Sequence, residues 1–408
     1  MSPLERWLRN GLGRAAIFLQ TADGRDYRDE ILHACTHDLT YDRQCEESRA
    51  HYLLNLIDLT GEPCFYHDAI VEHLRCDDES LDFDQMFELG GKFAADGSER
   101  MKAAMYEAFE RQGFANVGLA GADQLIILDG VEGFRFAMRS FDQVSAKDRA
   151  WMLSHVMETF RTYCSLDMFP EELRTLYAEW EEHERVCAER RKQPFAQPSY
   201  EEVRGAVMKK KRRAGMIFWA KRASEADVQR LARDLLEETD IDRLYGFVRL
   251  FHHRAFPGPI DRLLELVNHG DEDLARVSMC ALANLTSPQI RPIALEAAEN
   301  PETADLAVKL LIRNRAPGDE KLVERLIEQA SDDDSIHSIG MEVKEYVEAH
   351  PYDLPERSFL RLYECGPCSI CRWRFVEFLF ADKRAPAWLM EECRYDCYSA
   401  TRELIQGM

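Results

Sequence analysis

Apolar residues along this chain recur at intervals of three and four positions, and almost no stretch alternates apolar with polar residues. The first pattern is typical of amphipathic α-helices and the second of strands, so the sequence predicts an all-α protein. One segment, Leu125 to Leu128, is apolar enough for a short strand, although a buried helical segment fits it equally well. We therefore expect helices to make up the fold.

The helical pattern also repeats along the chain. In the C-terminal half, Asp-Leu-Ala at 273–275 returns 32 positions later at 305–307. In the N-terminal half, YRDEIL from Tyr27 returns as YHDAIV from Tyr66, 39 positions later. Such periods are typical of stacked helix pairs, in which each pair covers the apolar face of the next. The sequence thus predicts an α-solenoid and not one closed globule.

Breaks in the pattern divide the chain into three parts. Residues 1–165 and 224–408 carry the two sets of predicted helix pairs. Residues 166–223 form a charged connector, with a long helix after Pro170, a linker at 193–199 that contains two prolines, and a basic helix from Tyr200 to Arg222. We expect two helical domains joined by this connector, the second of which ends in a cysteine-rich unit.

The segment from His269 to Leu285 (HGDEDLARVSMCALANL) resembles the second half of a HEAT repeat. The matching positions are an acidic turn, an apolar anchor, a basic residue one position later than usual, and a tight-packing pair: Asp271 and Asp273, Leu274, Arg276, and Ala281-Leu282. The resemblance covers residues 224–350 well and 20–165 more weakly. The Pro-Cys-Ser-x-Cys-Arg and Glu-Glu-Cys segments near the C-terminus are similar to those of some bacterial HEAT-repeat proteins. The resemblance implies a right-handed superhelix in two parts, but it implies no particular reaction.

Charge and composition restrict the partners. The chain has 74 acidic and 52 basic side chains, a formal net charge of -22, so most of its surface repels nucleic acid and anionic lipid. No apolar run approaches the roughly 18 residues of a membrane span. The N-terminus lacks the apolar core and cleavage site of a secretory signal. With twelve cysteines in so charged a chain, we expect a cytoplasmic protein with reduced thiols.

One segment reverses this charge. Residues 204–222 contain no acidic residue and eight basic ones: Arg204, Lys209, Lys210, Lys211, Arg212, Arg213, Lys221 and Arg222. A basic amphipathic helix of this kind can bind phosphates, an anionic lipid surface or an acidic partner. The other interpretation is a solvated helix whose cations pair with the acidic residues of the chain itself.

The C-terminal unit concentrates cysteines. Zinc takes four nitrogen or sulfur ligands, and the best candidate set is Cys365, Cys368, Cys371 and Cys393. The alternative is that these sulfurs pack between helices, where cysteine behaves as a small hydrophobe. The tetrapeptide from Cys365 to Cys368 also has the letters of the thioredoxin redox motif. No βαβ pattern surrounds it, so the thioredoxin fold is excluded, while a reactive thiol stays an alternative.

Two histidine positions have a structural interpretation. His252-His253 lies near a predicted helix end, where a cationic side chain suits the helix dipole. The two rings point in different directions on a helix, so we do not expect a joint metal site. His337 follows three aspartates at 332–334, and we expect it to cap or pair with those carboxylates.

Signatures of catalysis are missing from the sequence. Gly90-Gly91-Lys92 lacks the first glycine and the hydroxyl residue of a P-loop, and neither GxSxG nor HExxH occurs. HEAT-like deoxyhypusine hydroxylases use several His-Glu pairs, whereas this chain has only His183-Glu184. We therefore predict a non-catalytic scaffold that binds a peptide or folded protein on a concave surface. The alternatives are a cysteine-dependent enzyme or redox sensor, and nucleic-acid or anion binding through residues 204–222.

Overall fold

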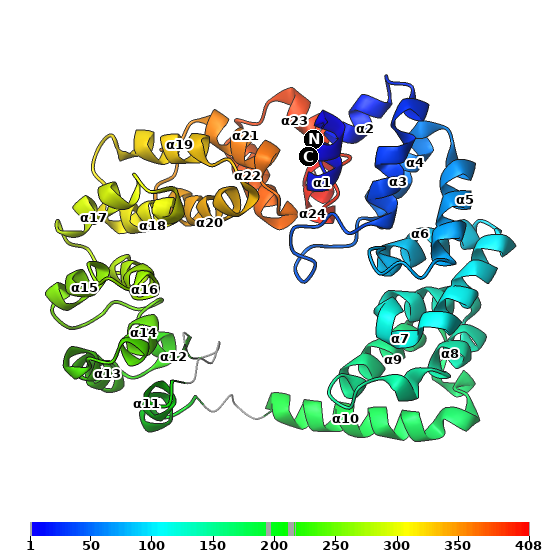
Figure 1. Ribbon diagram of the computed structural model, residues 1–408, viewed down its shortest axis with the longest axis horizontal. Helices are drawn as coiled ribbons and strands as arrows, with labels where there is room; N and C mark the ends of the chain where they lie inside the picture. Colours follow the sequence, from blue (N-terminus) through cyan, green and yellow to red (C-terminus); the bar gives the residue numbers. More distant parts are fainter. Residues whose placement is uncertain (1, 193–196, 211–215, 217, 408) are drawn as a thin grey trace. The chain divides into compact units, whose positions relative to one another are not determined.

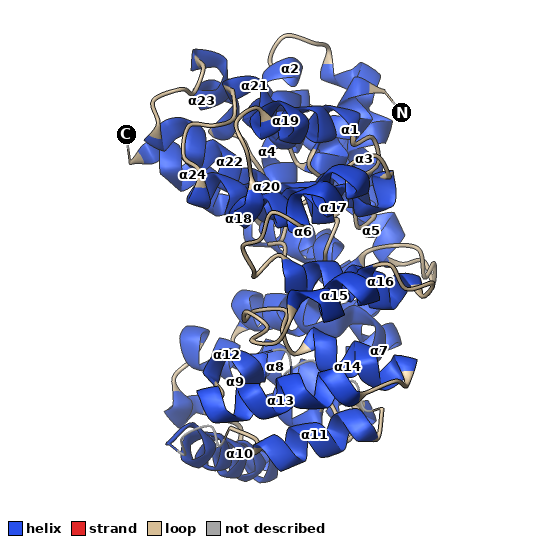
Figure 2. Ribbon diagram, turned by 90° about the vertical axis from the view of Figure 1, so that its left-hand side faces the viewer, coloured by secondary structure: helices blue, strands red, loops and turns tan. Residues whose placement is uncertain are grey.

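In a computed structural model of the chain, residues 2–192, 197–210, 216 and 218–407 are described. The secondary structure of these residues is helical throughout, without any strand (Figure 2). The all-α prediction is confirmed. The segment considered as a strand, Leu125 to Leu128, lies within helix α7 (Glu99–Asp129), where Leu125 and Ile126 are fully buried.

The helices group in two compact units. Unit 1 consists of Met1–Pro194, Cys368–Ile370 and Pro386–Met408, and unit 2 consists of Phe195–Pro367 and Cys371–Ala385. These boundaries differ from the expected ones at 165/166 and 223/224. The connector is divided between the two units, and the C-terminal residues belong with the N-terminal helices.

Unit 1 contains most of the helices of the N-terminal half and the last two helices of the chain (Figure 1). They are α1 (Pro3–Asn10), α2 (Arg14–Leu19), η1 (Gly24–Tyr27), α3 (Arg28–Thr36), α4 (Ala50–Thr60), α5 (Pro63–Leu74), α6 (Phe83–Ala95), α7, α8 (Val131–Met138), η2 (Phe141–Gln143), α9 (Arg149–Tyr163), η3 (Leu166–Met168), η4 (Glu171–Leu173), α10 (Arg174–Lys192), α23 (Ala387–Cys393) and α24 (Ser399–Gln406). The charged helix α10 joins unit 1 because its apolar side packs against α9. Tyr177 lies edge-on to Phe169 at 5.1 Å and to Trp180 at 5.4 Å.

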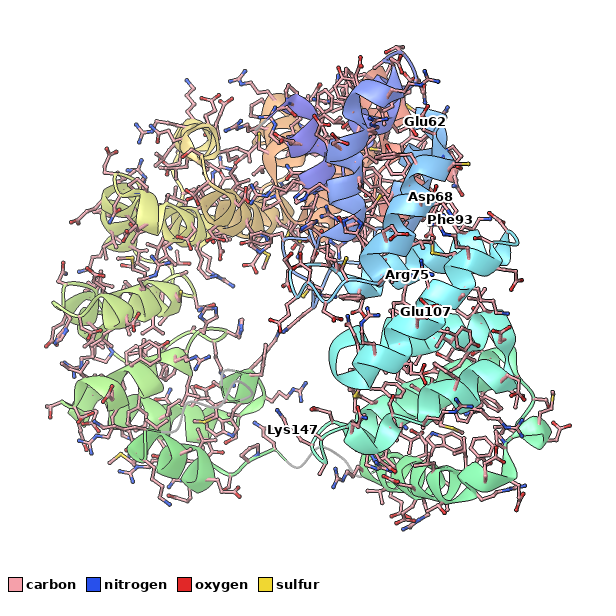
Figure 3. All side chains as sticks on the ribbon, turned by 45° about the vertical axis from the view of Figure 1, so that its right-hand side comes forward. Glu62, Asp68, Arg75, Phe93, Glu107 and Lys147 are labelled. Atoms are coloured by element: carbon pink, nitrogen blue, oxygen red, sulfur yellow. The ribbon has the colours of Figure 1, made fainter. Side chains whose placement is uncertain are left out.

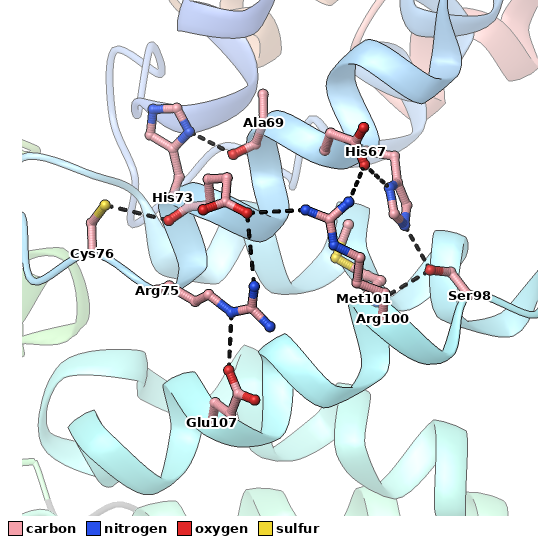
Figure 4. Close-up of polar contacts among 11 residues, drawn as sticks. His67, Ala69, His73, Arg75, Cys76, Ser98, Arg100, Met101 and Glu107 are labelled. Atoms are coloured by element: carbon pink, nitrogen blue, oxygen red, sulfur yellow. Dashed lines mark hydrogen bonds and ion pairs between the residues drawn. The ribbon is translucent and has the colours of Figure 1, made fainter.

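Ion pairs between residues 28 to 32 positions apart in the sequence connect α5 to α7. Arg100 donates to Asp68 at 2.6 Å and to Glu72 at 3.0 Å, and Arg75 donates to Glu107 at 3.0 Å (Figure 4). Asp68, Arg75 and Glu107 lie close together along the contact between the two helices (Figure 3). Because these side chains are largely exposed, each pair contributes at most about 1 kcal/mol. These pairs join α5 to the first turns of α7.

The C-terminal helices of unit 1 pack against its first two helices. Arg14 Nε donates to Glu392 Oε2 at 2.9 Å, and the Cys397 N–H donates to the Gly11 carbonyl at 2.9 Å. Gly13 is needed for this approach, since a Cβ there would lie 1.9 Å from the Glu392 oxygen. The repeat pattern alone did not predict this contact between the two ends of the chain.

Unit 2 contains the basic segment and the repeats of the C-terminal half. Its helices are α11 (Tyr200–Met208), α12 (Trp219–Arg222), α13 (Glu225–Glu237), α14 (Ile241–Arg249), α15 (Ile260–Val267), α16 (Glu272–Leu282), α17 (Ile290–Ala297), η6 (Pro301–Thr303), α18 (Ala304–Asn314), α19 (Asp319–Gln329), α20 (Asp333–Ala349), α21 (Glu356–Cys365) and the greater part of α22 (Ser369–Ala381). Helices α15, α17 and α19 each pack on the helix that follows (Figure 1). Helices α14, α16, α18 and α20 also contact one another in that order, and we call them the second-helix row.

Side chains at the ends of these helices connect one repeat to the next. Asn284 Nδ2 donates to the Phe251 carbonyl at 3.0 Å, and Asn314 Nδ2 donates to the Leu285 carbonyl at 3.0 Å. The two bonds span 33 and 29 positions, close to the period read from the sequence. Both satisfy backbone carbonyls near a helix end, which lack partners within the helix.

The residues that resemble a HEAT repeat have clear structural roles. Asp271 caps α16 by accepting a hydrogen bond from the Leu274 N–H at 2.9 Å, and Ala281 and Leu282 are fully buried. The Asp-Leu-Ala triplets at 273–275 and 305–307 are the second to fourth residues of α16 and α18. The repeated sequence therefore forms the same part of two helices that are neighbours in the second-helix row. Among the described helices, none combines the length and apolar character that crossing a membrane requires.

Candidate functional site

Helix α6 and the neighbouring part of α7 gather carboxylates that we call the α6 acidic face: Asp82, Asp84, Glu88 and Asp123. Asp82 caps α6, and Asp84 and Glu88 follow one helical turn apart. Asp123, on α7, is close enough to repel both Asp84 and Glu88. Arg43 donates to Asp82 and to Asp84 at 2.9 Å each. The single positive charge of Arg43 is therefore shared between the Asp82 and Asp84 carboxylates.

This arrangement raises the pKa values of its carboxyl groups. Burial is the largest cause for Asp82, Asp84 and Glu88, and repulsion from neighbouring carboxylates adds to it. Arg43 opposes the effect at Asp82 and Asp84, and a hydrogen bond from Ser48 opposes it at Glu88. Keeping these groups charged at neutral pH thus costs folding free energy. Groups with perturbed pKa values are concentrated at functional sites, although structural ion pairs also produce them.

The α6 acidic face differs from a metal site in its spacing. Asp123 accepts hydrogen bonds from Thr159 at 2.7 Å and from His155 at 2.9 Å, and this contact raises the pKa of His155. Within the described parts of the chain, no three ligand atoms of this face lie within 4.8 Å of one another. Separate cationic groups of a larger partner fit such spacing better than one ion does.

The second-helix row of unit 2 contains a buried ion pair. Lys309 Nζ on α18 donates to Glu342 Oε1 on α20 at 2.8 Å, and the two side chains are 15% and 14% exposed. Glu342 Oε2 is buried and accepts no hydrogen bond from the described residues. Burial raises the pKa of Glu342 in spite of Lys309. The ion pair connects α18 to α20, which are neighbours in the second-helix row.

The neighbours of this pair are not poised for catalysis. Burial raises the pKa of the Cys280 thiol to about 11, so the thiol is protonated at neutral pH and is a poor nucleophile. Burial, Lys309 and the adjacent His253 lower the pKa of His252 to about 4. His252 is therefore neutral at physiological pH. The sequence suggested a cationic side chain near a helix end, whereas the burial that keeps His252 neutral is seen only in the tertiary structure.

The basic segment does not form the single helix predicted from Tyr200 to Arg222. Helix α11 ends at Met208, and α12 comprises only the four residues from Trp219. Lys210 has a φ of 54°, in the left-handed region, which does not continue an α-helix. The prediction overlooked this turn because the stripe of apolar residues continues beyond it.

The basic residues of this segment have different environments. Arg204 pairs with Asp234 at 3.0 Å, and Lys210 pairs with Asp240 at 3.2 Å and with Asp242 at 2.8 Å. These contacts agree with pairing to the acidic residues of the chain itself. Three further side chains are exposed: Lys209, Lys221 and Arg222. The remaining predicted residues, Lys211, Arg212 and Arg213, lie outside the described residues.

The four cysteines predicted to bind zinc are divided between the two compact units: Cys368 and Cys393 belong to unit 1, and Cys365 and Cys371 to unit 2. A zinc site made of all four stays a prediction. Cys365 ends α21, where its Sγ accepts a hydrogen bond from Arg361 at 2.9 Å, and Cys393 is fully buried at the end of α23. His337 was expected to cap α20 or to pair with the aspartates at 332–334. The cap of α20 is Asp332, which accepts from the Ser335 N–H at 2.9 Å. Pairing of His337 with these carboxylates stays a prediction.

None of the twelve cysteines is paired in a disulfide. Cys365 lies at the C-terminal end of a helix, where the helix dipole disfavours a thiolate. The first cysteine of a thioredoxin motif lies instead at a helix N-terminus. The geometry of α21 thus gives no support to Cys365 as an attacking thiolate.

No family model, curated protein or solved structure matches this chain. Its candidate sites therefore depend on its own residues. The sequence carries a signal for the α6 acidic face, because Asp84 and Glu88 are four positions apart, a spacing that places both on one face of a helix. Their partial burial, and the closeness of Asp123 on another helix, required the tertiary structure.

Proposed function

We propose that this protein is a non-catalytic scaffold that binds a basic peptide or a basic protein on its rows of helices. In this proposal the repeats form an α-solenoid of the HEAT type, and its rows line an extended concave surface. The observation that carries the proposal is the α6 acidic face, where neighbouring carboxylates, Asp82 buried and Asp84 and Glu88 partly exposed, repel one another and two of them share the charge of Arg43.

A basic partner would supply what this face lacks. Lysine or arginine side chains placed beside Asp84 and Glu88 would favour their charged forms and recover the free energy that charging them costs. The net charge of -22 would also accelerate the encounter with a cationic partner at low ionic strength. The spacing of the carboxylates favours a partner with several cationic groups.

The test is an affinity pull-down from the native host, followed by binding measurements with the purified partner. We expect the wild type to capture a basic protein, and the double variant Asp84→Asn/Glu88→Gln to bind it at least about tenfold more weakly. The control, Glu110→Gln/Asp142→Asn, removes the same charge from exposed positions of unit 1 and should change affinity by less than about twofold. Added salt should weaken the wild-type complex.

A second measurement separates binding from folding. Because charged Asp84 and Glu88 cost folding free energy at neutral pH, the double variant should have a higher thermal midpoint than the wild type while it loses the partner. Equal binding by wild type and double variant would refute the proposal. So would a double variant that is less stable than the wild type, because the carboxylates would then be structural.

Two alternatives have weaker support. Among the described residues of 204–222, nucleic-acid or anion binding would depend mainly on Lys209, Lys221 and Arg222, since Arg204 and Lys210 already pair within the chain. Binding of a nucleic acid would weaken steeply with added salt. For a cysteine-dependent enzyme or redox sensor, burial raises the pKa values of the Cys35, Cys164 and Cys280 thiols, which disfavours the reactive thiolate at these positions.

A further inference from the structure

Helix α12 and the residue before it form one turn with two different sides. Phe218 has helical backbone angles, φ of -85° and ψ of -10°, and α12 follows it directly. Residues three and four positions apart share a face of a helix, so Phe218, Lys221 and Arg222 lie together. All three are exposed, whereas Trp219 and Ala220 are buried on the other side. The turn therefore presents an aromatic ring next to two cations.

The buried side fixes this turn within unit 2. Trp219 Nε1 donates to the Pro198 carbonyl at 2.6 Å. Arg254, which directly follows His252-His253, donates to the Ala220 carbonyl at 2.9 Å and to the Ala223 carbonyl at 2.7 Å. These bonds hold both the indole ring and the backbone of α12. The side chains on the exposed face consequently start from a fixed position.

The ring of Phe218 lies flat against the ring of His253. The two ring centroids are 5.2 Å apart, and the ring planes differ by only 9°. Although His253 contacts one face of the phenyl ring, Phe218 is still 51% exposed. The stack therefore leaves the second face of the phenyl ring to solvent. A flat aromatic group of a ligand can extend such a stack, as bases do on the aromatic side chains of proteins that bind single strands.

The charges around the stack favour an anion. Burial lowers the pKa of His253, and Lys221 and Lys309 lower it further, while Glu345 acts in the opposite direction. Among the described residues, Lys221 and Arg222 have no ion-pair partner, unlike the two basic residues of this segment that pair with aspartates. Both cations thus stay available to an anionic group, and they would repel a cationic one.

We propose that this face of α12 binds a nucleotide unit, with the base stacked on Phe218 and the phosphate paired with Lys221 and Arg222. The flat ring selects a planar aromatic group, and the two cations select an anion attached to it. A nucleotide combines both features. All of these side chains belong to unit 2, and the site does not depend on the proposed scaffold function. It also differs from binding by charge alone, because stacking contributes part of the affinity.

Two probes test the site with the unmodified protein: a short fluorescent oligothymidylate, measured by anisotropy, and adenosine monophosphate, measured by calorimetry. We expect binding of at least the first, weakened by salt with a logarithmic slope no steeper than about -1.4, the value for two phosphate contacts on a single strand. Comparable affinity for the mononucleotide would identify a free nucleotide as the ligand, and binding of the strand alone would identify single-stranded nucleic acid. Binding of neither probe would overturn the proposal.

Variants then separate stacking from charge. Phe218→Ala should weaken binding at least about fivefold, and Phe218→Leu, which keeps an apolar side chain without an aromatic face, should act similarly. Lys221→Gln/Arg222→Gln should weaken binding and flatten its salt dependence. The control, Arg233→Gln/Lys321→Gln, removes the same charge from exposed positions of unit 2 and should change affinity by less than about twofold. Equal binding by wild type and Phe218→Ala would exclude the stacked base.

A cross-link locates the bound base without any substitution in the protein. An oligonucleotide that carries photoreactive 5-iodouracil should attach to the peptides that contain Phe218 or His253, and attachment only elsewhere would contradict the site. Circular dichroism verifies that the Phe218 variants are folded, as the half-exposed ring leads us to expect. Vesicles of phosphatidylserine provide the last comparison. Vesicle binding that depends on Phe218, without nucleotide binding, would replace the proposal by a membrane contact.

Discussion

Replacing Gly13 by alanine should separate the C-terminal helices of unit 1 from its first helices. The backbone of Gly13, with φ of -60° and ψ of -15°, is ordinary for any residue, so alanine introduces no conformational strain. Its Cβ would nevertheless lie 1.9 Å from the Glu392 carbonyl oxygen and 3.0 Å from the Asp396 nitrogen. Cβ atoms essentially never come closer than 3.0 Å to other heavy atoms, so the chain around Glu392 has to move by about 1 Å.

The cost follows from the contacts at this place. Overpacking typically costs about 1–3 kcal/mol. The same movement disturbs the hydrogen bonds from Arg14 to Glu392 and from Cys397 to Gly11, each 2.9 Å long. A hydrogen bond to a charged group contributes about 1.5–3 kcal/mol and a backbone one about 1 kcal/mol. We therefore expect Gly13→Ala to destabilise unit 1 by about 3–5 kcal/mol.

The assay combines urea unfolding with hydrogen exchange, in which residues 386–408 should lose protection first. Two glycines that have open space around them serve as controls. Gly205→Ala, within α11, should be neutral or stabilise by up to about 1 kcal/mol. Gly61→Ala, at a φ of 70°, should cost only about 1–2 kcal/mol. The reasoning is refuted if Gly13→Ala costs no more than Gly61→Ala and residues 386–408 stay protected.

Three further predictions concern unit 2. Asn314→Ala should destabilise by about 1–3 kcal/mol in urea unfolding, because it removes hydrogen bonds from buried carbonyls, whereas Asn268→Ala on the exposed surface should change stability by less than about 0.5 kcal/mol. Lys309→Met should cost about 2–4 kcal/mol by leaving Glu342 buried without its cation, and adding Glu342→Leu should recover most of this loss in a double-mutant cycle. His252 has a pKa of about 4 in the folded chain and an ordinary value of 6.5, so the unfolded chain takes up its proton first and stability is lost as the pH falls from about 6.5 to 4. This loss amounts to at most about 3 kcal/mol, and the thermal midpoint of His252→Gln should fall less steeply over the same range than that of the wild type.

The helices and many of their ends were predictable because they depend on neighbours in the sequence. Gly61, for example, directly follows α4 with a φ of 70°, in the left-handed region that suits glycine at a helix end. Ser224 caps α13, because its Oγ accepts from the Asp227 N–H at 3.2 Å. The basic segment was predicted less well, since its apolar spacing continues across a turn at Lys210. Periodicity indicates an amphipathic face but does not show where the backbone leaves the helix.

The candidate sites depended on contacts between distant residues. Asp84 and Glu88 are visible on one predicted helix, but the repulsion from Asp123 depends on how α7 packs against α6. The four-cysteine set was assembled from sequence spacing alone, and its members are divided between the two compact units.

The sequence by itself determined that this protein is all-α, that its helices are amphipathic, and that parts of it repeat about every 32 positions, because these properties arise within a few turns of chain. Only the tertiary structure decided which residues meet across long separations, such as Arg14 with Glu392, 378 positions apart. The angle between packed helices depends on the shapes of all side chains at their contact, and the pattern of apolar and polar positions does not specify those shapes.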